Sequence, residues 1–276
     1  MSTFGFIGFG SMAKMIIHGL IEYANINPNN IYVTRKDKNR LNEINCVFKN
    51  VLAVTACKDI MEKARIVFIC AKPKEIRDIL SEIAPFVRSD THIISIAGTV
   101  SINNLQSIIH GKITKYTPTI TSEIGAGVSL LCHNALVNED DAAFVESVIK
   151  CFGKIKYVTD EDWGFAAELT SCMPGFIASI FDHLTNAALK HTTSFNKDLI
   201  AELITDTLYA TSKLFSDTDM DFEQVVLRVA TKGGITQEGV IFFDETLPQI
   251  FDDMFEKTLT KRHDVVEKIN KDFRNG

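Results

Sequence analysis

The sequence predicts an α/β protein in which a parallel sheet lies between two layers of helices, followed by an all-helical region. Three observations indicate this fold class. Short, unbroken apolar runs alternate with helical patterns between residues 4 and 157, as in βα units whose strands are buried on both faces. Beyond residue 159, apolar residues recur only at spacings of three and four, which is the period of a helix. The 276 residues are 46% hydrophobic with 15 glycines and 6 prolines, and this favours a globular chain of about two domains.

The expected strands of the first domain are the apolar runs themselves. They cover residues 4–7, 31–33, 66–70, 92–96, 112–116, 127–132 and 155–158. Helical patterns separate several of these runs, at residues 11–23, 38–44, 73–86 and 140–151. Because strand, helix and strand follow one another repeatedly, we expect a parallel sheet with helices on both faces over residues 1–159.

The second domain is expected to contain helices alone, over residues 160–276. Apolar residues at helical spacing occur over 163–169, 176–189, 199–215, 222–230 and 250–259. No run in this half is typical of a strand. Pro174 precedes the second of these patterns, where a proline starts or kinks a helix.

The composition argues against several classes of protein. The net charge is −6, with a mildly basic first part and a strongly acidic second part, so no basic stripe indicates a nucleic-acid groove. No stretch approaches the roughly 20 uninterrupted apolar residues that cross a bilayer. The six cysteines show neither metal-ligand nor disulfide-scaffold spacing, which is typical of reduced thiols in a cytosol. We therefore expect a cytoplasmic protein without a metal site and without a nucleic-acid or membrane partner.

The most specific motif follows the first expected strand directly and opens the first expected helix. It reads Gly8-Phe9-Gly10-Ser11-Met12-Ala13 and matches the GxGxxG/A fingerprint of Rossmann-type dinucleotide-binding domains. In this fingerprint the first glycine permits a tight turn, the second lets a pyrophosphate approach the backbone, and the small last residue packs closely on the strand. The amides at the helix N-terminus face the phosphates. A tight structural turn is the alternative, but the strand before and the helix after favour dinucleotide binding.

The end of the second expected strand indicates which nicotinamide coenzyme binds. An enzyme that uses NAD has Asp or Glu there to bind the ribose 2′-hydroxyl, whereas this chain has Thr34-Arg35-Lys36. Arg35 can stack on the adenine and pair with a 2′-phosphate, and Thr34 and Lys36 can donate hydrogen bonds to it. This favours NADPH over NADH, and the alternative is an ordinary exposed basic turn.

Two further strand ends are candidates for contact with the coenzyme. They are Ala71-Lys72-Pro73 and Ala97-Gly98. Ligands of open α/β folds bind at the carboxyl ends of strands, so Lys72 can lie near the nicotinamide ribose and Pro73 can shape the rim. A structural explanation is equally good for both segments, since a proline also starts a helix.

One glycine-rich segment interrupts the helical domain. It contains Thr231, Lys232, Gly233, Gly234 and Thr236. Two glycines at the start of a helix expose amides that can hold a substrate carboxylate, and a hydroxyl beside them can touch an imine nitrogen. A simple turn between two helices is the alternative. The seven histidines are scattered and indicate no nucleophile with its base.

In these motifs and in their order, the chain resembles the pyrroline-5-carboxylate reductase family over essentially its whole length. The segments that carry the resemblance are residues 5–13, 71–73, 95–98, 118–127, 170–176 and 231–239. The resemblance implies that the N-terminal domain binds NAD(P)H and that the helical domain joins two subunits into a homodimer or a larger assembly. It also implies that Thr236 contacts the ring nitrogen of the substrate and that the amides of Gly233 and Gly234 bind its carboxylate.

Three motifs depart from the family pattern. The family's Met-Pro-Asn-Thr-Pro is Thr-Pro-Thr-Ile-Thr at 117–121, its Ser-Gly-Ser-Gly-Pro-Ala-Tyr is Thr-Ser-Cys-Met-Pro-Gly-Phe at 170–176, and its Ser-Pro-Gly-Gly-Thr-Thr contains Lys232 here. The chain therefore looks most similar to the reductase-like proteins of bacterial late-competence operons. The activity that the resemblance implies is NADPH-dependent reduction of the imine of 1-pyrroline-5-carboxylate to proline. The alternatives are reduction of a different cyclic imine and a non-catalytic NADPH-binding regulatory protein.

Overall fold

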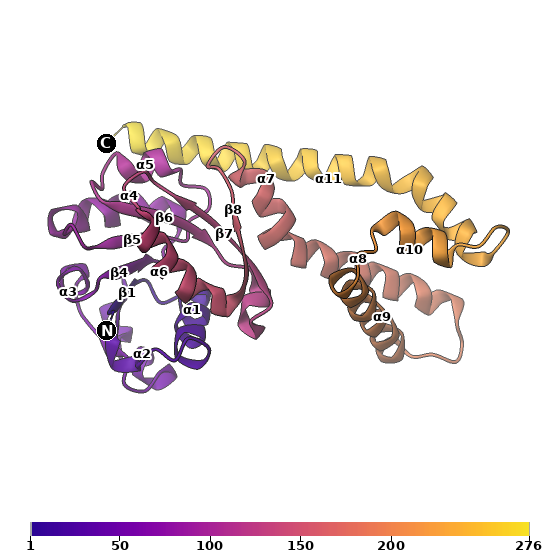
Figure 1. Ribbon diagram of the computed structural model, residues 1–276, viewed down its shortest axis with the longest axis horizontal. Helices are drawn as coiled ribbons and strands as arrows, with labels where there is room; N and C mark the ends of the chain where they lie inside the picture. The colour runs from indigo at the N-terminus through magenta and orange to yellow at the C-terminus, as the bar shows by residue number, and fades with distance from the viewer. Residues whose placement is uncertain (1, 276) are drawn as a thin grey trace. The chain divides into compact units, whose positions relative to one another are not determined.

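An eight-stranded sheet forms the centre of the α/β part of the structure, a computed structural model that describes residues 2–275 (Figure 1). The strand order is β3-β2-β1-β4-β5-β6-β7-β8. The strands are β1 (Phe4–Ile7), β2 (Ile31–Thr34), β3 (Leu52–Ala53), β4 (Ile66–Ile69), β5 (His92–Ser95), β6 (Lys112–Thr117), β7 (Gly127–His133) and β8 (Gly153–Tyr157). Every neighbouring pair is parallel except β6 and β7. The predicted fold class, a mainly parallel sheet followed by helices, is confirmed.

Two features of the sheet differ from the sequence prediction. Strand β3 has only two residues, of which Leu52 is exposed, so no apolar run marks it. Strand β7 is antiparallel to β6. The chain between these two strands forms only the short 3-10 turn η4 (Ile120–Ile124), and a connection without a crossover helix joins antiparallel neighbours.

Helices of the first part cover both faces of the sheet. They are α1 (Ser11–Glu22), α2 (Asn42–Val47), α3 (Cys57–Lys63), α4 (Pro73–Ile83), α5 (Ile102–Gln106) and α6 (Glu139–Ile149). Helices α1 and α6 contribute to one core cluster, and α3, α4 and α5 contribute to the other. Helices α3 and α5 were not predicted, because seven and five residues are too few to show a helical period.

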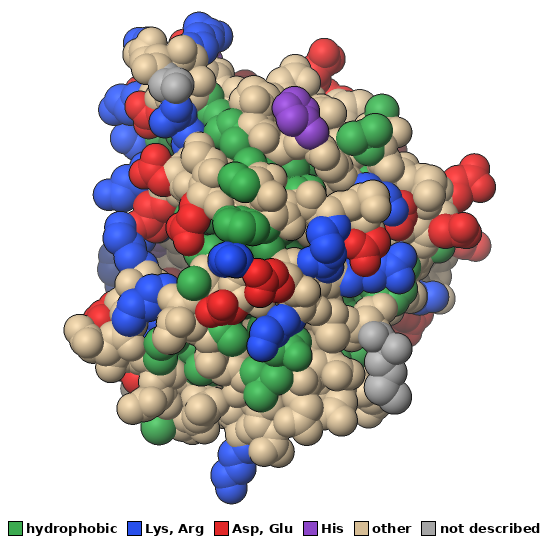
Figure 2. All heavy atoms as spheres, turned by 90° about the vertical axis from the view of Figure 1, so that its left-hand side faces the viewer, with side chains coloured by type: hydrophobic (Ala, Val, Ile, Leu, Met, Phe, Trp, Pro, Cys, Tyr) green, Lys and Arg blue, Asp and Glu red, His purple; other side chains and the backbone are tan. Residues whose placement is uncertain are grey.

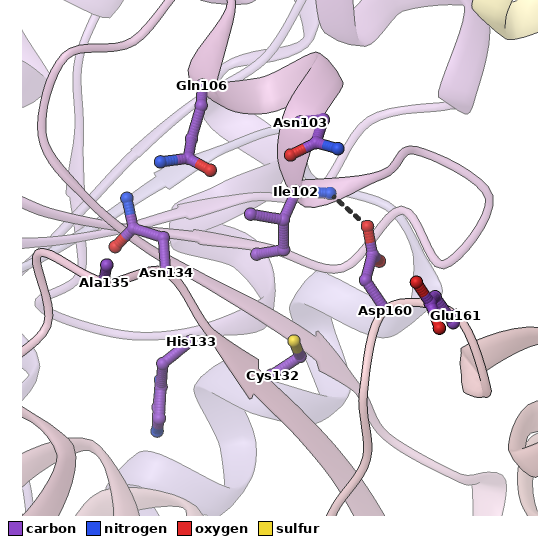
Figure 3. Close-up of a pocket in the computed structure, with 9 residues that line it drawn as sticks. All are labelled: Ile102, Asn103, Gln106, Cys132, His133, Asn134, Ala135, Asp160 and Glu161. Atoms are coloured by element: carbon purple, nitrogen blue, oxygen red, sulfur yellow. Dashed lines mark hydrogen bonds between the residues drawn. The ribbon is translucent and has the colours of Figure 1, made fainter.

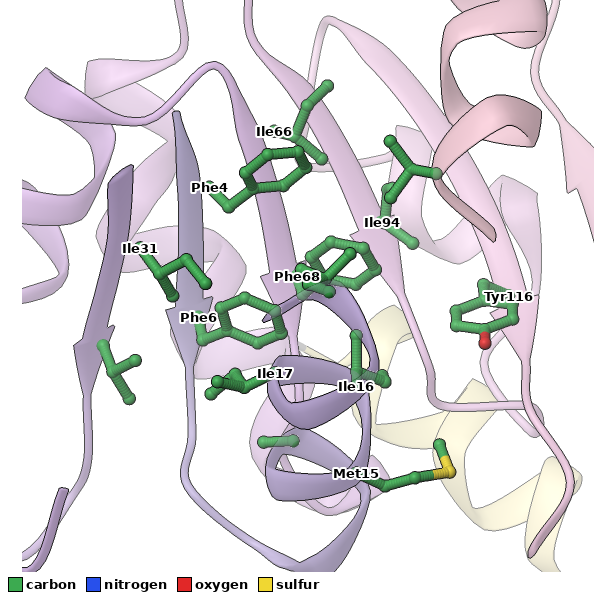
Figure 4. Close-up of a cluster of buried hydrophobic side chains, with 14 of the residues drawn as sticks. Phe4, Phe6, Met15, Ile16, Ile17, Ile31, Ile66, Phe68, Ile94 and Tyr116 are labelled. Atoms are coloured by element: carbon green, nitrogen blue, oxygen red, sulfur yellow. The ribbon is translucent and has the colours of Figure 1, made fainter. Parts of the chain in front are cut away.

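The core beneath α1 explains why the glycine motif is held firmly. Phe6 of β1 stacks on Phe68 of β4 with ring centroids 4.9 Å apart. Ile16 and Ile17 of α1 are completely buried against this layer (Figure 4). Burial of a large apolar side chain contributes about 1.5–3 kcal/mol, so both the strand before the glycine turn and the helix after it are anchored.

Within residues 2–275, helices are the only regular elements that follow β8. They are α7 (Trp163–Ala167), the π-helical turn η6 (Glu168–Cys172), α8 (Met173–Ala188), the 3-10 turn η7 (Leu189–His191), α9 (Lys197–Asp217), α10 (Phe222–Val229) and α11 (Ile235–Arg274). Pro174 is the second residue of α8, and only Met173 separates it from the wide π turn. Helix α11 has 40 residues and extends far beyond the predicted 250–259, because the exposed, charged parts of a long helix lack an apolar period.

The chain divides into two compact units. The first combines Met1–Pro174 with Leu259–Gly276, and the second is Gly175–Thr258. The predicted boundary at residue 160 lies where α/β structure changes to helices. The boundary between the two compact units lies later, after Pro174. Helix α11 contributes to both units, so its last part belongs with the sheet.

A pair of histidines, of which His92 is buried and His133 partly buried, is linked across three strands of the first unit. His92 Nε2 lies 2.7 Å from Thr114 Oγ1, which lies 2.7 Å from His133 Nδ1. Burial lowers the pKa of His92 to about 4, from an ordinary value of 6.5. The folded protein therefore binds this proton more weakly than the unfolded chain does.

We expect the free energy of unfolding to fall as the pH falls from about 6.5 to about 4, because only the unfolded chain protonates residue 92 in this range. At pH 5 the loss from His92 is roughly 2 kcal/mol relative to pH 7. Urea unfolding at both pH values measures it, and His92→Gln removes this part of the pH dependence. The same substitution at exposed His110 should leave the pH dependence unchanged, and equal behaviour of the two variants would contradict the assignment.

Candidate functional site

Gly8 forms the tight turn after β1, in a conformation that requires glycine. Its φ is +110°, in the region that side chains disfavour. A Cβ atom here would lie 2.2 Å from the carbonyl oxygen of Cys70. The Gly8 amide donates to the Thr34 carbonyl at 2.9 Å. The turn is therefore fixed between the ends of β2 and β4.

Gly10 borders open space at the start of α1. A Cβ atom at Gly10 would meet nothing within 4 Å, and no side chain caps the helix there. The first-turn amides of α1, from Ser11 and Met12 onward, have no acceptor within the helix. Ala13 is completely buried and packs the helix against the core. This cradle fits the pyrophosphate of a dinucleotide, as the motif predicts.

The carboxyl end of β2 carries more charged groups than Thr34-Arg35-Lys36 indicates. Arg35 pairs with Glu43 at 2.7 Å, and Lys36 pairs with Glu75 at 3.1 Å. Lys38 Nζ donates to Thr34 Oγ1 at 3.3 Å. Lys38, Arg40 and Glu43 were not predicted as site residues. The ion pair between Arg40 and Glu43 could have been predicted from their spacing of three residues, which brings two side chains together in a helical turn.

The other two predicted strand ends lie at the same edge of the sheet. Ile7 is in register with both Thr34 and Ile69, and Ile69 is in register with Ser95. The segments 71–73 and 97–98 therefore follow neighbouring strands beside the glycine turn. Pro73 is the first residue of α4, and the Lys72 amide donates to Glu75 Oε2 at 3.3 Å.

Unpaired polar atoms are buried beside Gly98. Thr117 Oγ1 and Trp163 Nε1 have no hydrogen-bond partner among residues 2–275. Each lies 3.2 Å from the position that a Cβ atom on Gly98 would occupy. Buried polar groups normally find a partner. The cradle at Gly10 and these two atoms at the same sheet edge fit a polar, extended ligand such as a nicotinamide dinucleotide.

The predicted substrate segment lies in the second unit, between α10 and α11, and is exposed. Gly233 has a φ of +73°, and its amide donates to Gln237 Oε1 at 2.6 Å. The Gly234 amide donates to the Thr231 carbonyl at 2.9 Å. Lys232 and Thr236 are exposed. The structure thus brings the predicted coenzyme residues together in one unit and places the predicted substrate residues together in the other.

A separate pocket of about 380 Å³ lies between α5, the end of β7 and the segment before α7 (Figure 3). Its lining includes none of the predicted site residues. Asp160 in this pocket accepts from the Ile102 amide at 2.8 Å and from Lys115, and Asn134 bonds to Ile113 and Gly111. Asp160 and Asn134 are therefore already paired, whereas His133 Nε2 is buried without a partner among residues 2–275. Because the glycine cradle and the other predicted coenzyme residues lie at the carboxyl edge of the sheet, we assign the functional site to that edge.

Charge on the surface is mixed where it can be seen directly. Figure 2 shows one face of the molecule, on which several basic side chains gather along the left-hand edge and acidic and basic side chains are mixed elsewhere.

Comparison with known families finds one match within the α/β part of the chain and another in the helical part. Residues 3–99 match the family "NADP oxidoreductase coenzyme F420-dependent", and residues 161–265 match "Pyrroline-5-carboxylate reductase dimerisation". The first match contains the glycine turn and the end of β2. The second contains α7 to α10 and most of α11.

Two curated proteins of Bacillus subtilis are similar over nearly the whole chain. Pyrroline-5-carboxylate reductase 3 is 32% identical, covering 98% of this chain and 99% of its own length. ComE operon protein 4 is 24% identical, covering 98% of both chains.

Solved structures show the same fold. The pyrroline carboxylate reductase of Plasmodium falciparum, solved with NADP bound, has a TM-score of 0.82 at 20% identity and covers 97% of this chain and 98% of its own. The 1-pyrroline-5-carboxylate reductase of Streptococcus pyogenes has a TM-score of 0.83 at 22% identity, covering 94% of this chain and 97% of its own.

Proposed function

Because the chain belongs to the pyrroline-5-carboxylate reductase family, whose members are NAD(P)H-dependent oxidoreductases, we propose that it reduces 1-pyrroline-5-carboxylate to proline with NADPH. The observation that carries this proposal is the glycine turn, where Gly8 cannot bear a side chain and Gly10 borders free space. The full-length similarity to a reductase of this name supports the choice of substrate.

Residues of the first unit would hold the coenzyme. The backbone from Gly8 to Ala13 binds the pyrophosphate, and Arg35 with its neighbours binds the 2′-phosphate. Segments 71–73 and 97–98 border the nicotinamide end. The bound coenzyme supplies the hydride, so the protein contributes alignment and exclusion of water rather than a strong acid.

Residues of the second unit would bind the substrate. Its carboxylate is an acceptor that can replace Gln237 Oε1 on the Gly233 amide, which is now engaged at 2.6 Å. The neighbouring Gly234 amide, which now donates to the Thr231 carbonyl at 2.9 Å, contributes a second donor once the carboxylate replaces that carbonyl. The exposed hydroxyl of Thr236 then orients the proton on the ring nitrogen, which makes the imine carbon electrophilic.

NADPH oxidation at 340 nm with 1-pyrroline-5-carboxylate tests the activity and the role of Thr236 together. We expect turnover by the unmodified protein and about 10- to 100-fold slower turnover by Thr236→Val, because a hydrogen bond to the reacting group is lost. Coenzyme affinity should stay unchanged. The control is Thr246→Val on the same helix, where the hydroxyl only bonds to the Phe242 carbonyl.

Two outcomes of this assay would reject parts of the proposal. Folded protein that binds NADPH without oxidising it in the presence of the substrate would leave a non-catalytic NADPH-binding role. Faster turnover of another cyclic imine, especially one with a second anionic group, would show that this imine is the substrate instead. The exposed cation Lys232, beside Gly233, is the feature that favours this second candidate.

We also propose that the helical domain joins two copies of the chain. Large apolar side chains of α8 are exposed at helical spacing, including Ile177, Ile180 and Leu184, and an exposed apolar stripe of this kind needs a partner surface. The stretch Trp163–His191 is long and apolar enough to cross a membrane by length and composition. It lies within the dimerisation match, so a second subunit accounts for its apolar surface. We place the homodimer in the cytoplasm, where exposed thiols such as Cys46 stay reduced.

A further inference from the structure

A charged cluster at the carboxyl end of β2 brings two guanidinium groups onto one carboxylate. Arg35 Nη1 lies 2.7 Å from Glu43 Oε2, and Arg40 Nε donates to the other oxygen, Oε1. Arg35 Nη1 also donates to the Arg40 carbonyl at 3.2 Å, which ties the two arginines together. Both oxygens of the Glu43 carboxylate are therefore occupied, each by a different arginine.

This cluster lies beside the proposed coenzyme site. Thr34 is in register with Ile7, and its carbonyl accepts from the Gly8 amide at 2.9 Å. Arg35 follows directly, at the position where folds of this class bind the adenine ribose. Lys38 adds a third cation, bonded to the Thr34 hydroxyl.

The arrangement of donors is one that binds an oxyanion. Two guanidinium groups directed at two oxygens of one anion match a phosphate monoester as well as a carboxylate. Hydrogen bonds from Arg40 and Arg35 hold the pKa of Glu43 below its ordinary value, so the carboxylate is ionised at neutral pH. A carboxylate and a phosphate held by the same two guanidinium groups would repel each other, so the two anions cannot occupy these donors together.

We propose that Glu43 competes internally with the 2′-phosphate of NADPH for Arg35 and Arg40. In the free protein Glu43 keeps both arginines in place, and on binding the phosphate takes over their donors. Glu43 thereby limits the preference for NADPH over NADH, whose ribose carries no phosphate. This inference rests on the proposed use of NADPH and adds a residue that determines coenzyme selectivity.

Titration calorimetry with NADPH and with NADH, on the full-length protein, tests the competition. Glu43→Gln should bind NADPH about tenfold more tightly, because the amide keeps the shape but removes the competing charge. Its affinity for NADH should change by no more than about twofold. Arg40→Gln should weaken NADPH binding and leave NADH binding unchanged. The control is Glu139→Gln, an equal charge change at an exposed position on α6, which should alter neither affinity.

Each other outcome overturns the inference in a recognisable way. An unchanged NADPH-to-NADH affinity ratio in Glu43→Gln would show that Glu43 does not compete, while binding of NADPH by the unmodified protein would leave the proposed function intact. Weaker NADH binding by Glu43→Gln would show instead that the carboxylate accepts from the ribose hydroxyl. Binding of neither coenzyme by the unmodified protein would overturn both the inference and the proposed function.

Discussion

Arg262→Leu is expected to lower the free energy of unfolding by about 3–5 kcal/mol, because it leaves an unpaired carboxylate in the interior. Arg262 Nε and Nη2 both donate to Glu168 Oε1, at 3.0 and 2.9 Å. Glu168 is only 3% exposed. The pair joins the π turn η6 to the last part of α11, within the first compact unit. Gly164 leaves room for it, since a Cβ there would lie 3.0 Å from Arg262 Cδ.

Urea unfolding monitored by circular dichroism measures this loss. The matched control is Lys197→Leu, which breaks the exposed pair with Asp182 in the second unit and should cost less than about 1 kcal/mol. The double variant Glu168→Met with Arg262→Leu should recover most of the stability, because an apolar pair needs no desolvation of charge. Equal losses in Arg262→Leu and Lys197→Leu would show that the buried pair does not stabilise the fold.

Gly10→Val is expected to weaken NADPH binding by at least about 100-fold without lowering the melting temperature noticeably, because its side chain fills the space proposed for the pyrophosphate. Open space surrounds the Gly10 Cβ position, so the added Cβ atom meets no protein atom. Calorimetric titration with NADPH and a thermal melt measure the two effects separately.

Gly8→Ala is the comparison that separates binding from folding. Its Cβ would lie 2.2 Å from the Cys70 carbonyl oxygen, at a φ of +110°, so we expect a clear loss of stability as well as of binding. If Gly10→Val binds NADPH as tightly as the unmodified protein, the pyrophosphate does not bind at this turn. The main support for the proposed site would then be lost.

Local patterns sufficed for much of the fold and for the coenzyme half of the site. The strands at 66–69 and 92–95 are apolar runs because both of their faces are buried. The glycine motif is recognisable because the positive φ at Gly8 requires a glycine at that position. The ends of β1, β2, β4 and β5 lie at one edge because parallel strands share a direction. The segment from Thr231 to Thr236 was recognisable from its two glycines, although its roles in substrate binding stay predictions.

The sequence by itself determined the fold class, the glycine turn and the order of the longer elements, since these depend on residues close together in the chain. Only the tertiary structure decided which distant charges meet. Glu168 and Arg262 are 94 positions apart, and neither side chain indicates alone that its partner is buried beside it. The same holds for the space around Gly10 and the atoms beside Gly98. A hydrogen bond or an ion pair depends on distance in space, and packing brings together groups that no local pattern relates.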